Sequence, residues 1–122
     1  MASVLVVEDE ADVAELLCEL LASYGHAVRH VTDGRAALES VTAGPRPDVV
    51  ITDMMLPGGL TGVGLARELR ARMPDLPVVL ASGQTEGIAE FRAAGLPVLR
   101  KPFRAAELEA AVRQALQGAR PA

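Results

Sequence analysis

The chain has 122 residues, which suffices for one domain with a single hydrophobic core. Hydrophobic residues make up 50% of it, the formal net charge is −4 and the arginines are scattered, so we expect no direct contact with nucleic acid. The single cysteine, Cys18, excludes a disulfide framework and a thiolate zinc cluster and is expected to pack against the core. The sequence shows no signal-peptide pattern and no apolar run of the ~18–20 residues that span a membrane, so we expect a cytoplasmic protein without membrane contact.

Short apolar runs alternate along the chain with longer helical patterns. Five runs are predicted to be strands, at 3–7, 26–31, 47–53, 76–82 and 97–101. Helical patterns follow them, at 13–24, 34–41, 62–73, 85–95 and 105–117. This alternation predicts an α/β fold with right-handed crossovers and a parallel sheet covered by helices on both faces. We expect residues 1–118 to form the domain and residues 119–122 a C-terminal tail.

The first helical pattern has the clearest apolar face. Val13, Leu16, Leu17, Leu20 and Leu21 recur with a period of 3.6 residues, so all five are expected to face the core.

Two histidines near the second predicted strand look unrelated to any site. His26 and His30 are expected to be surface or edge residues, away from the carboxyl ends of the central strands.

Polar side chains follow four of the five predicted strands. Glu8 and Asp9 follow the first, Asp53 ends the third, Ser82 ends the fourth and Lys101 ends the fifth. Ligands of open parallel sheets bind beyond these strand ends, and carboxylates that meet there repel one another unless a cation lies among them. Oxygen ligands of this kind suit Mg²⁺. Taken singly, each residue has a simpler explanation, as an acid at a helix start or as a turn residue.

Lys101 is the only lysine among the 12 Lys and Arg residues. Drift in an arginine-rich sequence would explain it. A phosphoryl group on Asp53 offers a physical reason, because lysine carries a compact point charge on a flexible stem, whereas arginine carries a broad planar fork.

Four ordered segments resemble the motifs of response-regulator receiver domains of two-component signalling. They are VLVVEDE (4–10), PDVVITDMMLP (47–57), VVLASG (78–83) and LRKPF (99–103), and the resemblance covers essentially the whole chain. It implies a flavodoxin-like (βα)5 fold with strand order 2-1-3-4-5.

The resemblance also implies roles for the residues at the strand ends. Asp53 would accept a phosphoryl group from a histidine kinase or a histidine phosphotransfer protein. Glu8, Asp9, Asp53 and the backbone carbonyl of Met55 would bind Mg²⁺.

The same family implies how the signal would be formed. Ser82 would be the hydroxyl that moves to the phosphoryl group, changing the loops after the fourth and fifth strands. Lys101 would contact the phosphoryl group and would precede a cis bond to Pro102. The protein would then be a phosphorylation switch in a two-component system or phosphorelay, not a metabolic enzyme.

Two other functions are weighed against this one. A receiver-like interaction module would bind a partner without being phosphorylated. A phosphohydrolase with an aspartyl nucleophile would need a second acid two residues after Asp53, where this chain has Met55.

Four features depart from the usual family pattern, the first being a Glu-Asp pair at residues 8–9 in place of Asp-Asp. The segment PGGLTG (57–62) holds one residue more than the usual P-x-x-x-G spacing, as in receivers of hybrid kinases. Val98 stands where the family usually has Tyr or Phe, and the stretch from Ser82 to Lys101 is a few residues short. Both a single-domain regulator and the receiver of a hybrid kinase fit this sequence.

Overall fold

The computed structural model describes residues 2–83 and 97–118. Within these residues the strands are β1 (Ser3–Val7), β2 (Ala27–Val31), β3 (Val49–Asp53), β4 (Val78–Ser82) and β5 (Val98–Arg100). The helices are α1 (Ala11–Ser23), α2 (Gly34–Ala43), α3 (Gly62–Arg72) and α5 (Ala105–Gly118). The helix predicted at 85–95 and the predicted tail lie outside the described residues.

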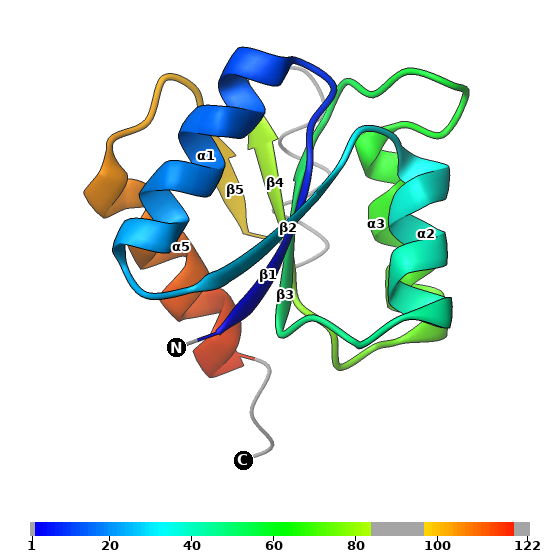
Figure 1. Ribbon diagram of the computed structural model, residues 1–122. Coiled ribbons are helices and arrows are strands. Elements are labelled where there is room, and N and C mark those ends of the chain that lie inside the picture. The colour runs from blue at the N-terminus through cyan, green and yellow to red at the C-terminus, as the bar shows by residue number, and fades with distance from the viewer. Residues whose placement is uncertain (1, 84–96, 119–122) are drawn as a thin grey trace.

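All strand pairs of the sheet are parallel, in the order β2-β1-β3-β4-β5. Helices α1 and α5 cover one face of the sheet, and α2 and α3 cover the other (Figure 1). The predicted fold class and strand order are therefore confirmed. The strand order reverses between β1 and β3, which is where such sheets place their ligands.

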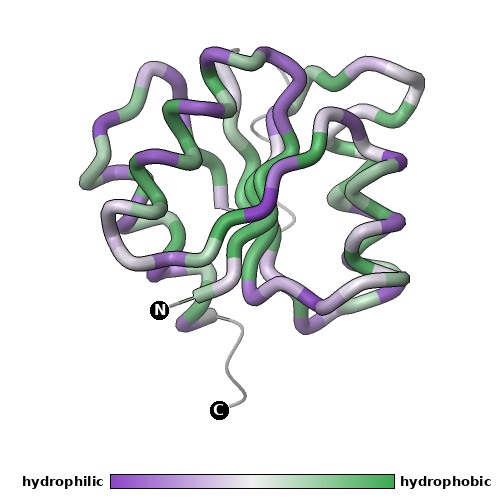
Figure 2. The backbone as a smooth tube through the Cα atoms, viewed as in Figure 1, coloured by the Kyte–Doolittle hydropathy of each residue, from purple (hydrophilic) through white to green (hydrophobic). Residues whose placement is uncertain are grey.

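The core forms two layers because side chains of a strand alternate between its faces. In β1, Val4 and Val6 pack under α1 and α5, whereas Leu5 and Val7 pack under α2 and α3. The strands accordingly form a hydrophobic band through the middle of the molecule (Figure 2). None of the described helices is both long and apolar enough to cross a membrane.

The predicted core face of α1 is partly wrong. Its buried residues are Ala14, Leu17 and Leu21, whereas Leu16 is 53% exposed. The helix is rotated so that the smaller Ala14 faces the sheet and Leu16 faces solvent. Cys18 packs against the core beside this face, as predicted, and burial raises the pKa of its thiol.

Side-chain caps fix where α2 and α3 begin. The Oδ1 atom of Asp33 accepts a hydrogen bond from the Ala36 N–H at 2.8 Å, and Thr61 Oγ1 accepts one from the Gly64 N–H at 3.1 Å. Each satisfies a backbone donor that the first turn of a helix leaves unpaired. The start of α3 is thereby defined close to the carboxyl end of β3.

Candidate functional site

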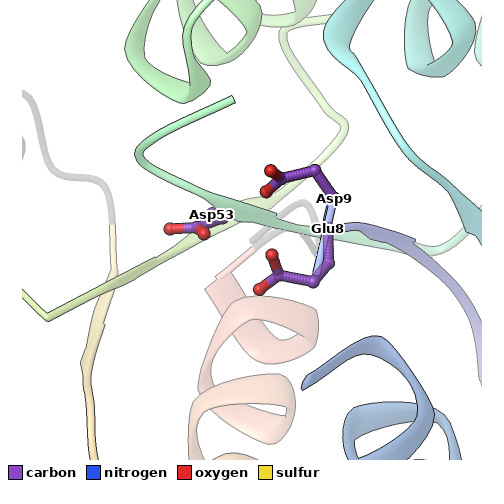
Figure 3. A group of neighbouring side chains, drawn as sticks. All are labelled: Glu8, Asp9 and Asp53. Carbon is purple, nitrogen blue, oxygen red and sulfur yellow. The ribbon is translucent and has the colours of Figure 1, made fainter. Parts of the chain in front are cut away.

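Three carboxylates meet beyond the carboxyl ends of β1 and β3. Glu8 and Asp9 follow β1, and Asp53 is the last residue of the neighbouring strand β3. One oxygen of each carboxylate lies within 4.8 Å of the others, and the Glu8 and Asp9 side chains extend toward the side on which Asp53 lies (Figure 3). Glu8 is 1% exposed, Asp53 is half-buried and Asp9 is exposed. The predicted convergence of these residues is confirmed.

Lys101 reaches into this cluster from the end of β5. Its Nζ atom lies 3.3 Å from Glu8 Oε1 and 3.3 Å from Asp53 Oδ2. Its backbone N–H donates to the Ser82 carbonyl at 2.8 Å, and the bond to Pro102 is cis, as predicted. The only lysine of the chain is thus shared equally between two acids of the site.

Burial and the neighbouring charges shift two pKa values at the site. Burial raises the pKa of the Glu8 carboxyl, and the charge of Asp53 raises it further. The hydrogen bond from the Glu10 N–H and the charge of Lys101 oppose this shift without cancelling it. Burial alone would lower the pKa of the Lys101 ammonium, but the charges and hydrogen bonds of Asp53 and Glu8 raise it overall. Lys101 therefore stays charged, and its one ammonium group faces three carboxyl groups at the site.

Ser82 and Met55 flank the acidic cluster. Ser82 ends β4 with 1% exposure, and its Oγ donates to the Sδ atom of the buried Met54 at 3.4 Å. The Met55 side chain is exposed, and its backbone N–H donates to Asp53 Oδ1 at 3.4 Å. The predicted hydroxyl thus lies at the end of the strand next to the one that carries Asp53. The thioether acceptor Met54 was not anticipated, although it directly follows Asp53 in the sequence.

The prediction that both histidines are surface or edge residues away from the site is partly wrong, because His30 contacts a residue of the site and the His26 side chain is buried. The Nε2 atom of His30 bonds the backbone carbonyl of Glu8 at 2.8 Å, so this edge residue supports the acidic turn. The His26 side chain is 8% exposed, and its Nε2 lies 2.7 Å from Glu109 Oε1 on α5. Its Nδ1 accepts the Ala2 N–H at 3.2 Å, so Nε2 carries the proton that is donated to Glu109. The partners in these hydrogen bonds are far apart in the sequence, so no local sequence pattern could have predicted them.

The site combines hard oxygen ligands with one ammonium group. Close carboxylates suit a small divalent cation such as Mg²⁺. The neighbouring ammonium suits an anion carried on Asp53. The residues therefore fit a metal ion and a small anion side by side.

Comparison with known proteins identifies the family. The family model for the response regulator receiver domain matches residues 4–113. The chain belongs to this family. It is thus a receiver of the kind found in two-component signalling, whose members generally bind Mg²⁺ in an acidic pocket.

Individual relatives agree with this assignment. The sensory transduction protein RegX3 of Mycobacterium tuberculosis (strain ATCC 25618 / H37Rv) is 38% identical over 120 residues, covering 96% of this chain and 52% of RegX3. The DNA-binding response regulator MtrA of Mycobacterium leprae (strain TN) is 35% identical over 117 residues, covering 93% of this chain and 51% of MtrA. This receiver therefore spans about half the length of these curated relatives.

A solved structure shares the whole fold. The response regulator receiver protein from Sinorhizobium medicae WSM419 has a TM-score of 0.86 and 30% identity, covering 97% of this chain and 96% of that one.

The structure locates two of the departures from the usual family pattern, whereas most of the short stretch between Ser82 and Lys101 lies outside the described residues. Val98 is half-buried and packs against the core on the α2 and α3 face. In the longer loop after β3, Gly58 and Gly59 have φ angles of 84° and 87°, which other residues rarely adopt.

Proposed function

We propose that this receiver is a phosphorylation switch, with Asp53 as the acceptor of a phosphoryl group from a phosphohistidine. The observation that carries the proposal is the position of Lys101 Nζ, 3.3 Å from Asp53 Oδ2, beside the cluster of Glu8, Asp9 and Asp53. A phosphoryl group added to Asp53 would lie next to the positive charge of Lys101. The phosphohistidine belongs to a histidine kinase or a histidine phosphotransfer protein.

The transfer forms one bond and breaks one bond. A carboxylate oxygen of Asp53 attacks phosphorus in line, and the phosphorus–nitrogen bond of the donor breaks with its electron pair passing to the imidazole. Glu8, Asp9, Asp53 and the Met55 carbonyl would hold Mg²⁺, which would offset negative charge on the transferring oxygens. Lys101 stabilises the same charge directly. Later, water attacks phosphorus, the bond to Asp53 breaks, and free phosphate and the original carboxylate result.

The switch itself depends on Ser82. In the unphosphorylated structure its hydroxyl donates to Met54 Sδ, which is a weak acceptor. A phosphoryl oxygen is a stronger, charged acceptor, so we expect phosphorylation to draw the hydroxyl toward Asp53 and to change the loop after β5. The loop after β4, where a change is also predicted, lies outside the described residues.

The output of this receiver is a change in protein contacts. We propose that it acts in the cytoplasm without touching nucleic acid itself, and that it is not a metabolic enzyme. MtrA is a DNA-binding regulator, and this chain matches about half of it. Whatever the complete protein binds, this domain would act by controlling the partner domain or protein.

A titration followed by amide chemical shifts tests the proposal. Mg²⁺ is added to the full chain with and without a small acyl phosphate donor. We expect Mg²⁺ alone to shift the amides of Asp9 and Asp53, and the donor to cause further shifts at Ser82 and Lys101. Shifts that do not depend on the donor would favour an interaction module that works without phosphorylation.

A further inference from the structure

The loop between β3 and α3 contains the one residue that exceeds the usual family spacing. It leaves β3 through Met54 and Met55, turns at Gly58 and Gly59, and returns to start α3 at Gly62. In Figure 1 this loop lies beside the start of α2. None of the roles assigned so far explains why the loop takes this path.

Leu60, near the end of this loop, packs against the first turns of α2 and α3. The residue is half-buried and packs against the core. A Cβ atom placed on Gly34, the first residue of α2, would lie 2.8 Å from Leu60 Cδ2 and 2.9 Å from its Cγ. A Cβ atom on Gly64 in α3 would lie 3.0 Å from Leu60 Cδ1. Leu60 therefore fills a slot that exists because both positions lack a side chain.

The end of the loop next to α3 contacts the backbone at Asp53, the proposed acceptor of the phosphoryl group. The Gly62 N–H donates to the Met54 carbonyl at 3.0 Å. A Cβ atom on Gly62 would collide with the Asp53 carbonyl oxygen. Thr61, between Leu60 and Gly62, caps α3. A continuous set of contacts thus runs from the start of α2 through Leu60 to the peptide groups of Asp53 and Met54.

We propose that Leu60 is a positioning residue for the metal site. Seated between Gly34 and Gly64, it holds the loop so that the Asp53 backbone and the Met55 carbonyl are in place before the cation binds. Because groups that orient ligands contribute strongly to metal affinity, loss of this anchor weakens Mg²⁺ binding without removing any ligand. This inference rests on the proposed function, since it assigns the Met55 carbonyl to the metal.

The first test compares Leu60→Ala with Leu38→Ala. Leu38 is also half-buried and packs against the same core, but it belongs to α2 and not to the loop. Both substitutions lower the free energy of unfolding. We expect Leu60→Ala to weaken Mg²⁺ binding roughly tenfold, as measured by amide shift titration of the full chain, while Leu38→Ala changes the dissociation constant less than about twofold.

A second variant keeps Leu60 and changes Gly34, one of the two glycines against which Leu60 packs. Gly34 has no positive φ angle, and alanine is the better helix former, so Gly34→Ala is compatible with α2. Its methyl group nevertheless displaces Leu60. Gly34→Ala should therefore weaken Mg²⁺ binding in the wild-type background and have little further effect when combined with Leu60→Ala.

The outcomes separate this inference from the proposed function. Equal Mg²⁺ affinities of Leu60→Ala and Leu38→Ala, or an unchanged affinity in Gly34→Ala, would overturn the role of Leu60 while leaving the metal site intact. If Leu60→Ala does not fold, the Gly34→Ala titration decides. Failure of the wild type to bind Mg²⁺ would overturn the proposed function, and the positioning role with it.

Discussion

Glu8 shows how the site works at the scale of single residues. Its carboxylate is 1% exposed, and each of its polar groups has a partner. The backbone N–H donates to Val31, the carbonyl bonds His30, Oε2 accepts from Glu10 and Oε1 pairs with Lys101. These contacts fix the side chain, yet its pKa remains raised. The fold therefore buries the Glu8 carboxyl where its charged form is disfavoured. Such a group is expected at a site that binds a cation, because the cation would stabilise the charged form.

Replacing Glu8 with glutamine should stabilise the metal-free protein. The pKa of the carboxyl in the folded state exceeds its usual value of 4.5, so the charged form destabilises the fold above the folded pKa. We expect Glu8→Gln to raise the free energy of unfolding at neutral pH, on the order of 1 kcal/mol. The advantage should shrink as the pH falls through the folded pKa and vanish below about 4.5, where both states are protonated.

Urea unfolding with a chelator present, from about pH 4 to about pH 8, measures this effect. Glu10→Gln is the matched control, because it makes the same chemical change at a side chain that is exposed. A wild type more stable than Glu8→Gln at neutral pH would contradict the destabilising role of the charge.

At the scale of elements, the position of α1 could be predicted from its own sequence, but the face that it buries could be predicted only in part. The five strands lie within two residues of their predicted bounds, because their short length, their β-branched residues and the turn residues around them favour strands over helices. The apolar stripe of α1, in contrast, is wider than the surface that the sheet and α5 can cover. Which edge of the stripe stays in water depends on the neighbouring elements, so the exposure of Leu16 could not be derived from the helix alone.

Two adjacent leucines of α1 test this description. Leu17 is 2% exposed and Leu16 is 53% exposed. Leu17→Ala should lower the free energy of unfolding by about 2–5 kcal/mol, because it leaves a cavity in the core. Leu16→Ala should change it by less than about 0.5 kcal/mol. Urea unfolding of both variants measures the difference, and similar losses would mean that the rotation of α1 is wrong.

At the scale of the whole molecule, parallel topology creates the site. Residues 8, 9, 53, 82 and 101 are far apart in sequence, but the carboxyl ends of β1, β3, β4 and β5 lie along one edge of the sheet. The rule that ligands bind at this edge was enough to predict the convergence of the three carboxylates and of Lys101. The rule could not predict the partners of His30, His26 or Ser82, since those depend on side-chain packing across elements.

Intact mass shows directly whether Asp53 accepts a phosphoryl group. The full chain is incubated with Mg²⁺ and a small acyl phosphate donor, alongside Asp53→Asn. Asp48→Asn is the control, because Asp48 is exposed and accepts from the Ser3 N–H at 2.8 Å, at the opposite end of β1 from the acidic cluster.

We expect the wild type and Asp48→Asn to gain the mass of one phosphoryl group. Asp53→Asn should gain none, and a chelator should abolish the gain in every sample. A gain that persists in Asp53→Asn would show that Asp53 is not the acceptor, and would overturn the proposed function. So would the absence of any gain in the wild type from both the small donor and a phosphorylated histidine kinase domain.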